Sequence, residues 1–261
     1  MLLENKNAVI YGAGGSIGGA VAKEFSREGA SVFLVGRTRE KLEAVADDIE
    51  SAGGSVEVAE LDALDEKAVD EHARAVAERA GSIDVSFNLV SRGDVQGIPL
   101  VEMTADDLLR PVVSGLRTNF ITARAAARCM VEQGSGVILA LDSGSAKGSP
   151  MMGGTGLADA ATDTFFRNLA AEIGPQGVRV LGIWTAGLPE TFSRERLAEV
   201  DGRFEDEAAM RGLIESLDGM RMTRRSPRLA EVAATAAFLA SDKAGAITGT
   251  FVNVTSGMFP S

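Results

Sequence analysis

The chain has 261 residues, of which 45% are hydrophobic and 24% are charged, and its formal net charge at pH 7 is −11. These fractions are ordinary for a globular protein with a sizeable core, so we expect one domain over residues 1–261. The acidic surplus would repel a nucleic-acid backbone and an anionic membrane surface, which argues against both as partners.

The single cysteine, Cys129, and the single histidine, His72, provide neither an internal disulfide nor a set of metal ligands, so we expect no metal site. The first residues lack the basic and apolar stretches of a secretion signal. No run approaches the roughly 18 apolar residues of a membrane span. We therefore expect a cytoplasmic protein.

Short β-branched apolar runs alternate with longer segments of helical period along the whole chain. The predicted strands are 7–11, 31–35, 56–61, 83–90, 136–141, 178–184 and 250–254. The predicted helices include 40–51, 66–80, 112–133, 159–173 and 229–241. This alternation predicts an α/β fold of three layers, with a Rossmann-type, doubly wound sheet of about seven parallel strands.

A glycine-rich turn follows the first predicted strand and opens an amphipathic helix. Its predicted cofactor-binding residues are Gly12, Gly14, Gly15, Ser16, Ile17 and Gly18. Glycines here permit a tight turn, a close approach of the backbone to a pyrophosphate, and close packing of helix on sheet. The pyrophosphate would lie at the helix N-terminus, where free N–H groups favour an anion.

The end of the second predicted strand indicates which dinucleotide is bound. A carboxylate about 20 residues past such a turn normally binds the ribose 2′-OH of NAD. Gly36 occupies that position here, and Arg37 follows it. A guanidinium suits the 2′-phosphate of NADP, so we predict NADP, although NAD and an ordinary surface role for Arg37 stay open.

Two local patterns concern helix starts and a long connection. Thr104, three residues before Asp107, is typical of a helix cap, and Pro111 suits a first helical turn. Residues 190–225 form a charged, glycine-punctuated segment of helical composition without a strand. We interpret this segment as a lid or insertion over a site at the carboxyl ends of the strands, the alternative being a surface excursion.

Several stretches resemble the short-chain dehydrogenase/reductase family over nearly the whole chain. Residues 83–91 resemble its IDVLVNNAG, residues 186–191 its PGxxxT, and residues 256–257 its closing GG. The resemblance implies cofactor contacts by Asp62 with the adenine, by Asn88, and by Thr191 with the nicotinamide carboxamide. It also implies a small-molecule substrate and a homodimer or homotetramer built on residues 111–133, 155–173 and 251–254.

The chain departs from this family at the catalytic positions. The usual tyrosine position falls on Thr155, the lysine position on Asp159 and the relay asparagine on Gly115, whereas Ser143 keeps the catalytic serine. Tyr11 is the only tyrosine, so no other alignment restores the motif. A phenol needs a neighbouring cation to act as an acid near neutral pH, and that pairing is lost.

Four residues are candidates by position for a replacement acid: Asp142, Asp159, Lys147 and Arg92. Asp159 removes a cation from the nicotinamide ribose, although it could accept hydrogen bonds from the hydroxyls. Pro189 removes a backbone N–H near the carboxamide. We expect weakened binding at this end of the cofactor.

These features predict an NAD(P)-dependent oxidoreductase of short-chain type, with a non-standard site, acting on a carbonyl or alcohol. The apolar residues 150–154 favour a lipophilic substrate, unless the methionines serve only packing. One alternative is a catalytically silent NADP-binding sensor or partner subunit. A second is a non-redox isomerase or dehydratase that uses the same cleft.

Overall fold

The computed structural model describes residues 1–192 and 207–259, and its centre is a seven-stranded parallel sheet of order β3-β2-β1-β4-β5-β6-β7. The strands are β1 (Asn7–Tyr11), β2 (Ser31–Gly36), β3 (Val56–Glu60), β4 (Val85–Asn88), β5 (Gly136–Asp142), β6 (Val178–Trp184) and β7 (Phe251–Asn253). Each predicted strand is present, with ends that differ by up to two residues. The prediction of a doubly wound parallel sheet is confirmed.

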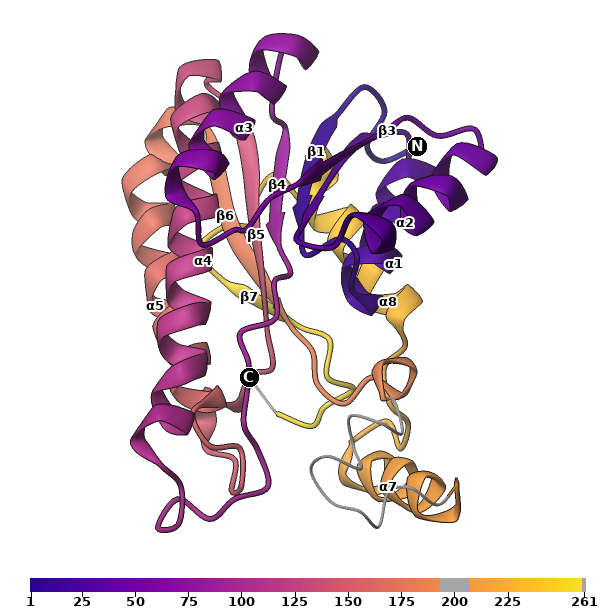
Figure 1. The fold of residues 1–261 in the computed structure, drawn as a ribbon, viewed down its shortest axis with the longest axis vertical. Coiled ribbons are helices and arrows are strands. Elements are labelled where there is room, and N and C mark those ends of the chain that lie inside the picture. Colours follow the sequence, from indigo (N-terminus) through magenta and orange to yellow (C-terminus); the bar gives the residue numbers. More distant parts are fainter. Residues whose placement is uncertain (193–206, 260–261) are drawn as a thin grey trace.

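Helices cover both faces of the sheet (Figure 1). One layer holds α1 (Ser16–Arg27), α2 (Arg39–Ser51) and α8 (Leu229–Ala240), and the other holds α3 (Glu66–Ala80), α4 (Ala105–Gln133) and α5 (Thr155–Ile173). Right-handed crossovers between parallel strands produce these layers. Because the strands are parallel, their carboxyl ends lie at the same edge of the sheet, which faces the lower part of the molecule in Figure 1.

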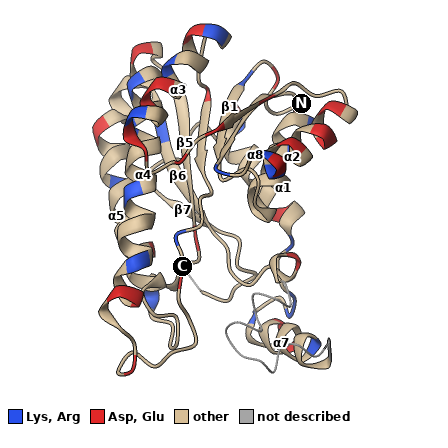
Figure 2. Ribbon diagram, in the orientation of Figure 1, with Lys and Arg blue, Asp and Glu red and all other residues tan. Residues whose placement is uncertain are grey.

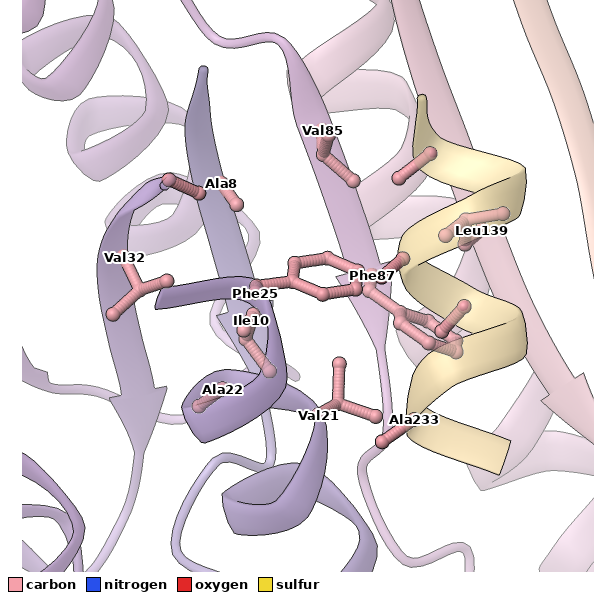
Figure 3. Close-up of a cluster of buried hydrophobic side chains, with 14 of the residues drawn as sticks. Ala8, Ile10, Val21, Ala22, Phe25, Val32, Val85, Phe87, Leu139 and Ala233 are labelled. Atoms are coloured by element: carbon pink, nitrogen blue, oxygen red, sulfur yellow. The ribbon is translucent and has the colours of Figure 1, made fainter. Parts of the chain in front are cut away.

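The core consists of two apolar layers, one on each face of the sheet. Figure 3 shows the layer beneath α1 and α8, where Phe25 of α1 lies against Phe87 of β4 and Ile10 of β1. All three side chains are fully buried. Because central parallel strands are covered on both faces, their residues form continuous apolar runs, which is the pattern that the sequence shows.

The start of α4 confirms one prediction and corrects another. The Thr104 side chain accepts a hydrogen bond from the Asp107 N–H at 3.1 Å, so the predicted cap is present. Pro111, however, lies inside α4 and not in its first turn. A proline there removes one helical hydrogen bond. Its ring packs closely on the backbone at the start of α5, since a Cβ built on Gly154 would lie 2.9 Å from Pro111 Cγ.

Part of the predicted lid, residues 193–206, lies outside the described residues. The described remainder includes α7 (Glu207–Met220), which lies at the lower end of the molecule (Figure 1). The buried Arg221 joins the end of α7 to the exit of β6, because its guanidinium donates to the carbonyls of Ala186 at 2.8 Å and Gly187 at 3.1 Å.

Charged residues of both signs are interspersed over the helices, and most of the central sheet carries none (Figure 2). None of the helices within the described ranges is long and apolar enough to cross a bilayer. The expectation about nucleic acid rests on the net charge alone and stays a prediction.

Candidate active site

The strand order reverses between β1 and β4, which are neighbours in the sheet although three helices and two strands separate them in the chain. Their outgoing segments diverge to opposite faces of the sheet. Such a reversal opens a crevice at the carboxyl ends of the strands, where open α/β sheets bind ligands. The glycine turn after β1 and the loop after β4 border this crevice.

The glycine turn has the geometry of a phosphate cradle. Gly12 has φ +77°, and a Cβ at that position would lie 2.5 Å from the Leu89 carbonyl oxygen. A Cβ on Gly18 would lie 2.3 Å from the Gly12 oxygen, so α1 packs directly on the turn. Gly15 caps α1 without any side-chain hydrogen bond, and Gly15 and Ser16 are exposed. The N–H groups at this helix start therefore face outward and suit the pyrophosphate of a dinucleotide.

The two arginines after β2 differ in their surroundings. Arg39 Nε donates to Glu43 Oε1 at 2.7 Å. Arg37 is exposed, and its side chain forms no ion pair within residues 1–192 and 207–259. Asp62, after β3, is held in place by a hydrogen bond from the Leu64 N–H at 3.0 Å. These surroundings fit a ribose 2′-phosphate at Arg37 and an adenine contact at Asp62.

Asn88 and Thr191 already have partners within the protein. The Asn88 amide donates to Asn119 Oδ1 at 2.9 Å, and its oxygen accepts from the Val90 N–H at 3.2 Å. Asn88 is buried and joins the end of β4 to α4. The Thr191 hydroxyl donates to the Leu188 carbonyl at 2.8 Å. Their cofactor contacts stay predictions, and a structural role accounts for both side chains.

A network of charges centred on Arg92 lies at the carboxyl ends of β4 and β5. Arg92 Nε lies 3.1 Å from both Asp94 oxygens, Nη1 lies 3.1 Å from Asp142 Oδ1, and Nη2 lies 2.7 Å from Asp159 Oδ1. The side chains of Asp142 and Asp159 are 0% exposed, that of Arg92 is 13% exposed and that of Asp94 is 27% exposed. Three of the four candidate residues are thus brought together, and Asp94 joins them.

Gly115 provides the room that Arg92 occupies. A Cβ at this position would lie 2.9 Å from Arg92 Cδ and 3.3 Å from Arg92 Cβ. Glycine inside a helix costs about 1 kcal/mol relative to alanine, so it needs a packing reason, and the arginine stem supplies one. Gly115 therefore leaves room for the stem of Arg92, and Asp159 pairs with its guanidinium.

The pKa values of the two buried carboxyls, Asp142 and Asp159, are shifted in opposite directions. Burial and then the charge of Asp159 raise the pKa of Asp142 well above its ordinary value, and the Arg92 guanidinium opposes them only in part. Burial also works to raise the pKa of Asp159, but Arg92 and hydrogen bonds from Ser143 and Ser145 outweigh it and lower that pKa. Burial and the neighbouring carboxylate therefore favour the neutral form of Asp142, whereas Arg92 and the two serines favour the charged form of Asp159.

This arrangement corrects the expectation about Asp159, whereas the catalytic role of Ser143 stays a prediction. Asp159 cannot accept hydrogen bonds from ribose hydroxyls, because it is buried and its oxygens are taken by Arg92, Ser143 and Ser145. Ser143 lies at the predicted place, but its Oγ is 2.6 Å from Asp159 Oδ2, so its hydrogen points at the carboxylate. The fourth candidate, Lys147, lies with its Nζ 5.2 Å from the centre of the Trp184 ring.

The Thr155 hydroxyl has no hydrogen left to donate to a substrate. Its hydroxyl lies 2.7 Å from Asp94 Oδ1 and accepts from Gln96 Nε2 at 3.1 Å. Tyr11 is buried in β1, and burial raises the pKa of its phenol, so it cannot replace the missing tyrosine. Sequence reasoning missed Asp94. Its position two residues after Arg92 was the available signal, but which carboxylates an arginine reaches depends on the loop conformation.

The fold and the cradle define a dinucleotide-binding protein of the doubly wound α/β class. A family pattern described as enoyl-(acyl carrier protein) reductase matches residues 12–259. The chain is 32% identical to the short-chain reductase protein NovJ of Streptomyces niveus, over 96% of this chain and 92% of NovJ. It is 30% identical to the L-rhamnose 1-dehydrogenase (NAD(P)(+)) of Azotobacter vinelandii, over 99% and 98%.

Solved structures agree with these sequence relatives. Levodione reductase superposes with a TM-score of 0.86 at 28% identity, covering 97% of each chain. NAD+-bound xylitol dehydrogenase has a TM-score of 0.87 at 24% identity, covering 98% of this chain and 100% of that one, and shows the shared fold. The chain belongs to the short-chain dehydrogenase/reductase family of oxidoreductases.

Proposed function

We propose that the protein is an NADP-dependent oxidoreductase that transfers hydride between the nicotinamide and a small, largely apolar molecule. The observation that carries this proposal is the cradle formed by the start of α1, which no side chain caps, and by Arg37 after β2, which forms no ion pair with the residues that the structure describes. The start of α1 would bind the pyrophosphate, and Arg37 would bind the 2′-phosphate. When bound, the cofactor supplies the hydride.

Ser143, Arg92 and Asp159 form the polar floor of the proposed site. A buried charge network destabilises a protein unless every charged group in it is paired. A member of this family that catalysed no reaction would gain nothing from such a network at the carboxyl ends of the strands. Apolar residues on the loop after β5 support an apolar substrate, since Met151 is exposed and Met152 half-buried. The Arg92 network therefore supports a rebuilt site rather than an eroded one.

A silent NADP-binding role is the second candidate, and one specific observation favours it. The only tyrosine is buried in the sheet, and the Ser143 hydrogen is directed at Asp159. A site without a free proton donor would bind the cofactor without reducing a carbonyl. Both candidates require nucleotide binding, so binding is the first property to test.

The test is calorimetric titration with NADPH and with NADH of the wild type, Arg37→Ala and the matched control Arg39→Ala. We expect NADPH to bind more tightly than NADH, and Arg37→Ala to weaken NADPH by about tenfold or more while leaving NADH unchanged. Arg39 is paired with Glu43, so its variant should retain the wild-type affinities. If neither nucleotide binds, the proposal and its alternative are both wrong.

We also propose a homo-oligomer built on α4 and α5. A groove between these helices is lined by apolar side chains that include Phe120, Phe165 and Leu169, and by charged ones that include Arg128 and Glu172. Phe120 is exposed. Apolar surface of this kind gains free energy when a second copy covers it. Light scattering should give the mass of a dimer or tetramer, and a Phe120→Glu variant should shift it toward the monomer.

A further inference from the structure

The hydroxyl groups of the proposed site direct their hydrogens at carboxylates. Ser143 and Ser145 lie 2.6 Å and 2.8 Å from Asp159 Oδ2, and Thr155 lies 2.7 Å from Asp94 Oδ1. A hydroxyl has one hydrogen, and an ionised carboxylate only accepts. Toward a bound substrate, these three groups can therefore offer lone pairs but no hydrogen.

The charges of the site are unequal as well. Three carboxylates surround the single guanidinium of Arg92, and Asp94 is the most exposed of them. Two further cations nearby have other partners among the described residues. Arg110 pairs with Asp107 at 2.7 Å, and Lys147 lies over the Trp184 ring. Even with a proton on Asp142, the network keeps a surplus negative charge.

Asp142 adds no donor that a ligand could use. Its side chain is 0% exposed, its Oδ1 accepts from Arg92 at 3.1 Å, and its Oδ2 has no hydrogen-bond partner among the described residues. The three hydroxyls and the excess of carboxylates over cations therefore suit the site to a ligand that brings positive charge, and they suit it poorly to one that develops negative charge.

A substrate that accepts hydride can be a neutral carbonyl compound or a positively charged iminium ion. Hydride addition to a neutral carbonyl creates an alkoxide, which needs donors and a proton. Hydride addition to an iminium ion forms the C–H bond with the two hydride electrons, and the C=N π pair becomes the nitrogen lone pair. This reaction consumes positive charge and requires no proton, and a reduced nicotinamide dinucleotide is the reductant.

We propose that the substrate is a small apolar molecule that carries a C=N⁺ group, whose charge lies beside Asp94. This proposal rests on the proposed function and narrows it from the carbonyl or alcohol expected from the sequence. Thr155 stands where the resemblance to the family places a tyrosine, and its hydroxyl donates to Asp94. The carboxylate of Asp94 therefore lies where relatives would offer a neutral phenol as proton donor. Its partial exposure leaves it accessible to the ligand.

The test compares two bicyclic compounds of similar shape, the permanently charged 2-methyl-3,4-dihydroisoquinolinium and the neutral ketone 1-tetralone. Equilibrium binding to the protein without nucleotide is measured by calorimetry, and turnover is followed by NADPH absorbance. The variants are Asp94→Asn and the control Glu102→Gln, an exposed carboxylate of the same loop. Melting curves and NADPH affinity report whether each variant is folded.

We expect the cation to bind at least about fivefold more tightly than the ketone, and Asp94→Asn to abolish that preference, whereas Glu102→Gln leaves it unchanged. In turnover, the cation should consume NADPH faster than the ketone. Equal or tighter binding of the ketone overturns the proposal, whether or not either compound is reduced. Ketone reduction with NADPH would then leave the proposed function standing, while absent nucleotide binding would refute that function separately.

Discussion

Replacement of Arg92 by methionine should destabilise the protein more than any exposed substitution, because it strands two buried carboxyls. Asp142 and Asp159 are 0% exposed and lie 3.1 Å and 2.7 Å from the guanidinium. Removing one partner of a buried ion pair typically costs about 3–5 kcal/mol in the free energy of unfolding. For a chain of this size, the melting temperature should fall by on the order of 10 °C.

The assay is urea unfolding followed by circular dichroism at pH 8, pH 5 and pH 3. The pKa of Asp159 is lowered below its ordinary value of 3.8 in the wild type, so its stabilisation is present above 3.8 and is lost as pH falls from there through the folded value. Without Arg92 this stabilisation is absent at every pH, so the difference between wild type and variant should persist at pH 5 and shrink at pH 3.

Two further variants separate charge from packing. The triple variant Arg92→Met with Asp142→Asn and Asp159→Asn should recover most of the lost stability, because no buried charge is then left unpaired. The control Arg39→Met removes an exposed pair and should cost less than about 1 kcal/mol. A loss below about 1 kcal/mol for Arg92→Met, or no recovery in the triple variant, would refute the reasoning.

Three other predictions follow from single sites. Gly18→Ala places a Cβ 2.3 Å from the Gly12 oxygen and should weaken both folding and NADPH binding. Gly19→Ala, whose nearest contact would be a Val45 methyl at 3.2 Å, should be milder in denaturation and calorimetry. Gly115→Ala should destabilise the protein despite the better helix propensity of alanine, because it crowds Arg92, and a more stable variant would contradict the packing role. Burial and then Arg79 lower the pKa of His72 to about 4, so NMR titration should find it there, and the stability advantage over His72→Gln should fall as pH drops from about 6.5 to about 4.

Strand identity was predictable because buried parallel strands form uninterrupted β-branched runs bounded by glycine or polar residues. The 178–184 run, for example, is β6 without any shift of its ends. The Thr104 cap was predictable for a similar reason, since it depends on residues three apart. Pro111 was not, because a tertiary contact with the backbone at Gly154 holds it inside α4.

The cofactor cradle was more accessible to sequence reasoning than the reaction site. Gly12 and Gly18 act through backbone geometry within one strand–turn–helix unit. The Arg92 network instead joins residues 50 and 67 positions apart, and the loop conformation decides which carboxylates the guanidinium reaches. That is why Asp159 was expected to face a ribose and instead lies beneath Arg92.

The most direct test of the whole account is a crystal structure of the NADPH complex. We predict the pyrophosphate at the start of α1, the 2′-phosphate beside Arg37, and Asp159 still paired with Arg92 and out of contact with the ribose. A complex in which Asp159 leaves Arg92 to bind the ribose hydroxyls, or in which the 2′-phosphate lies away from Arg37, would contradict it.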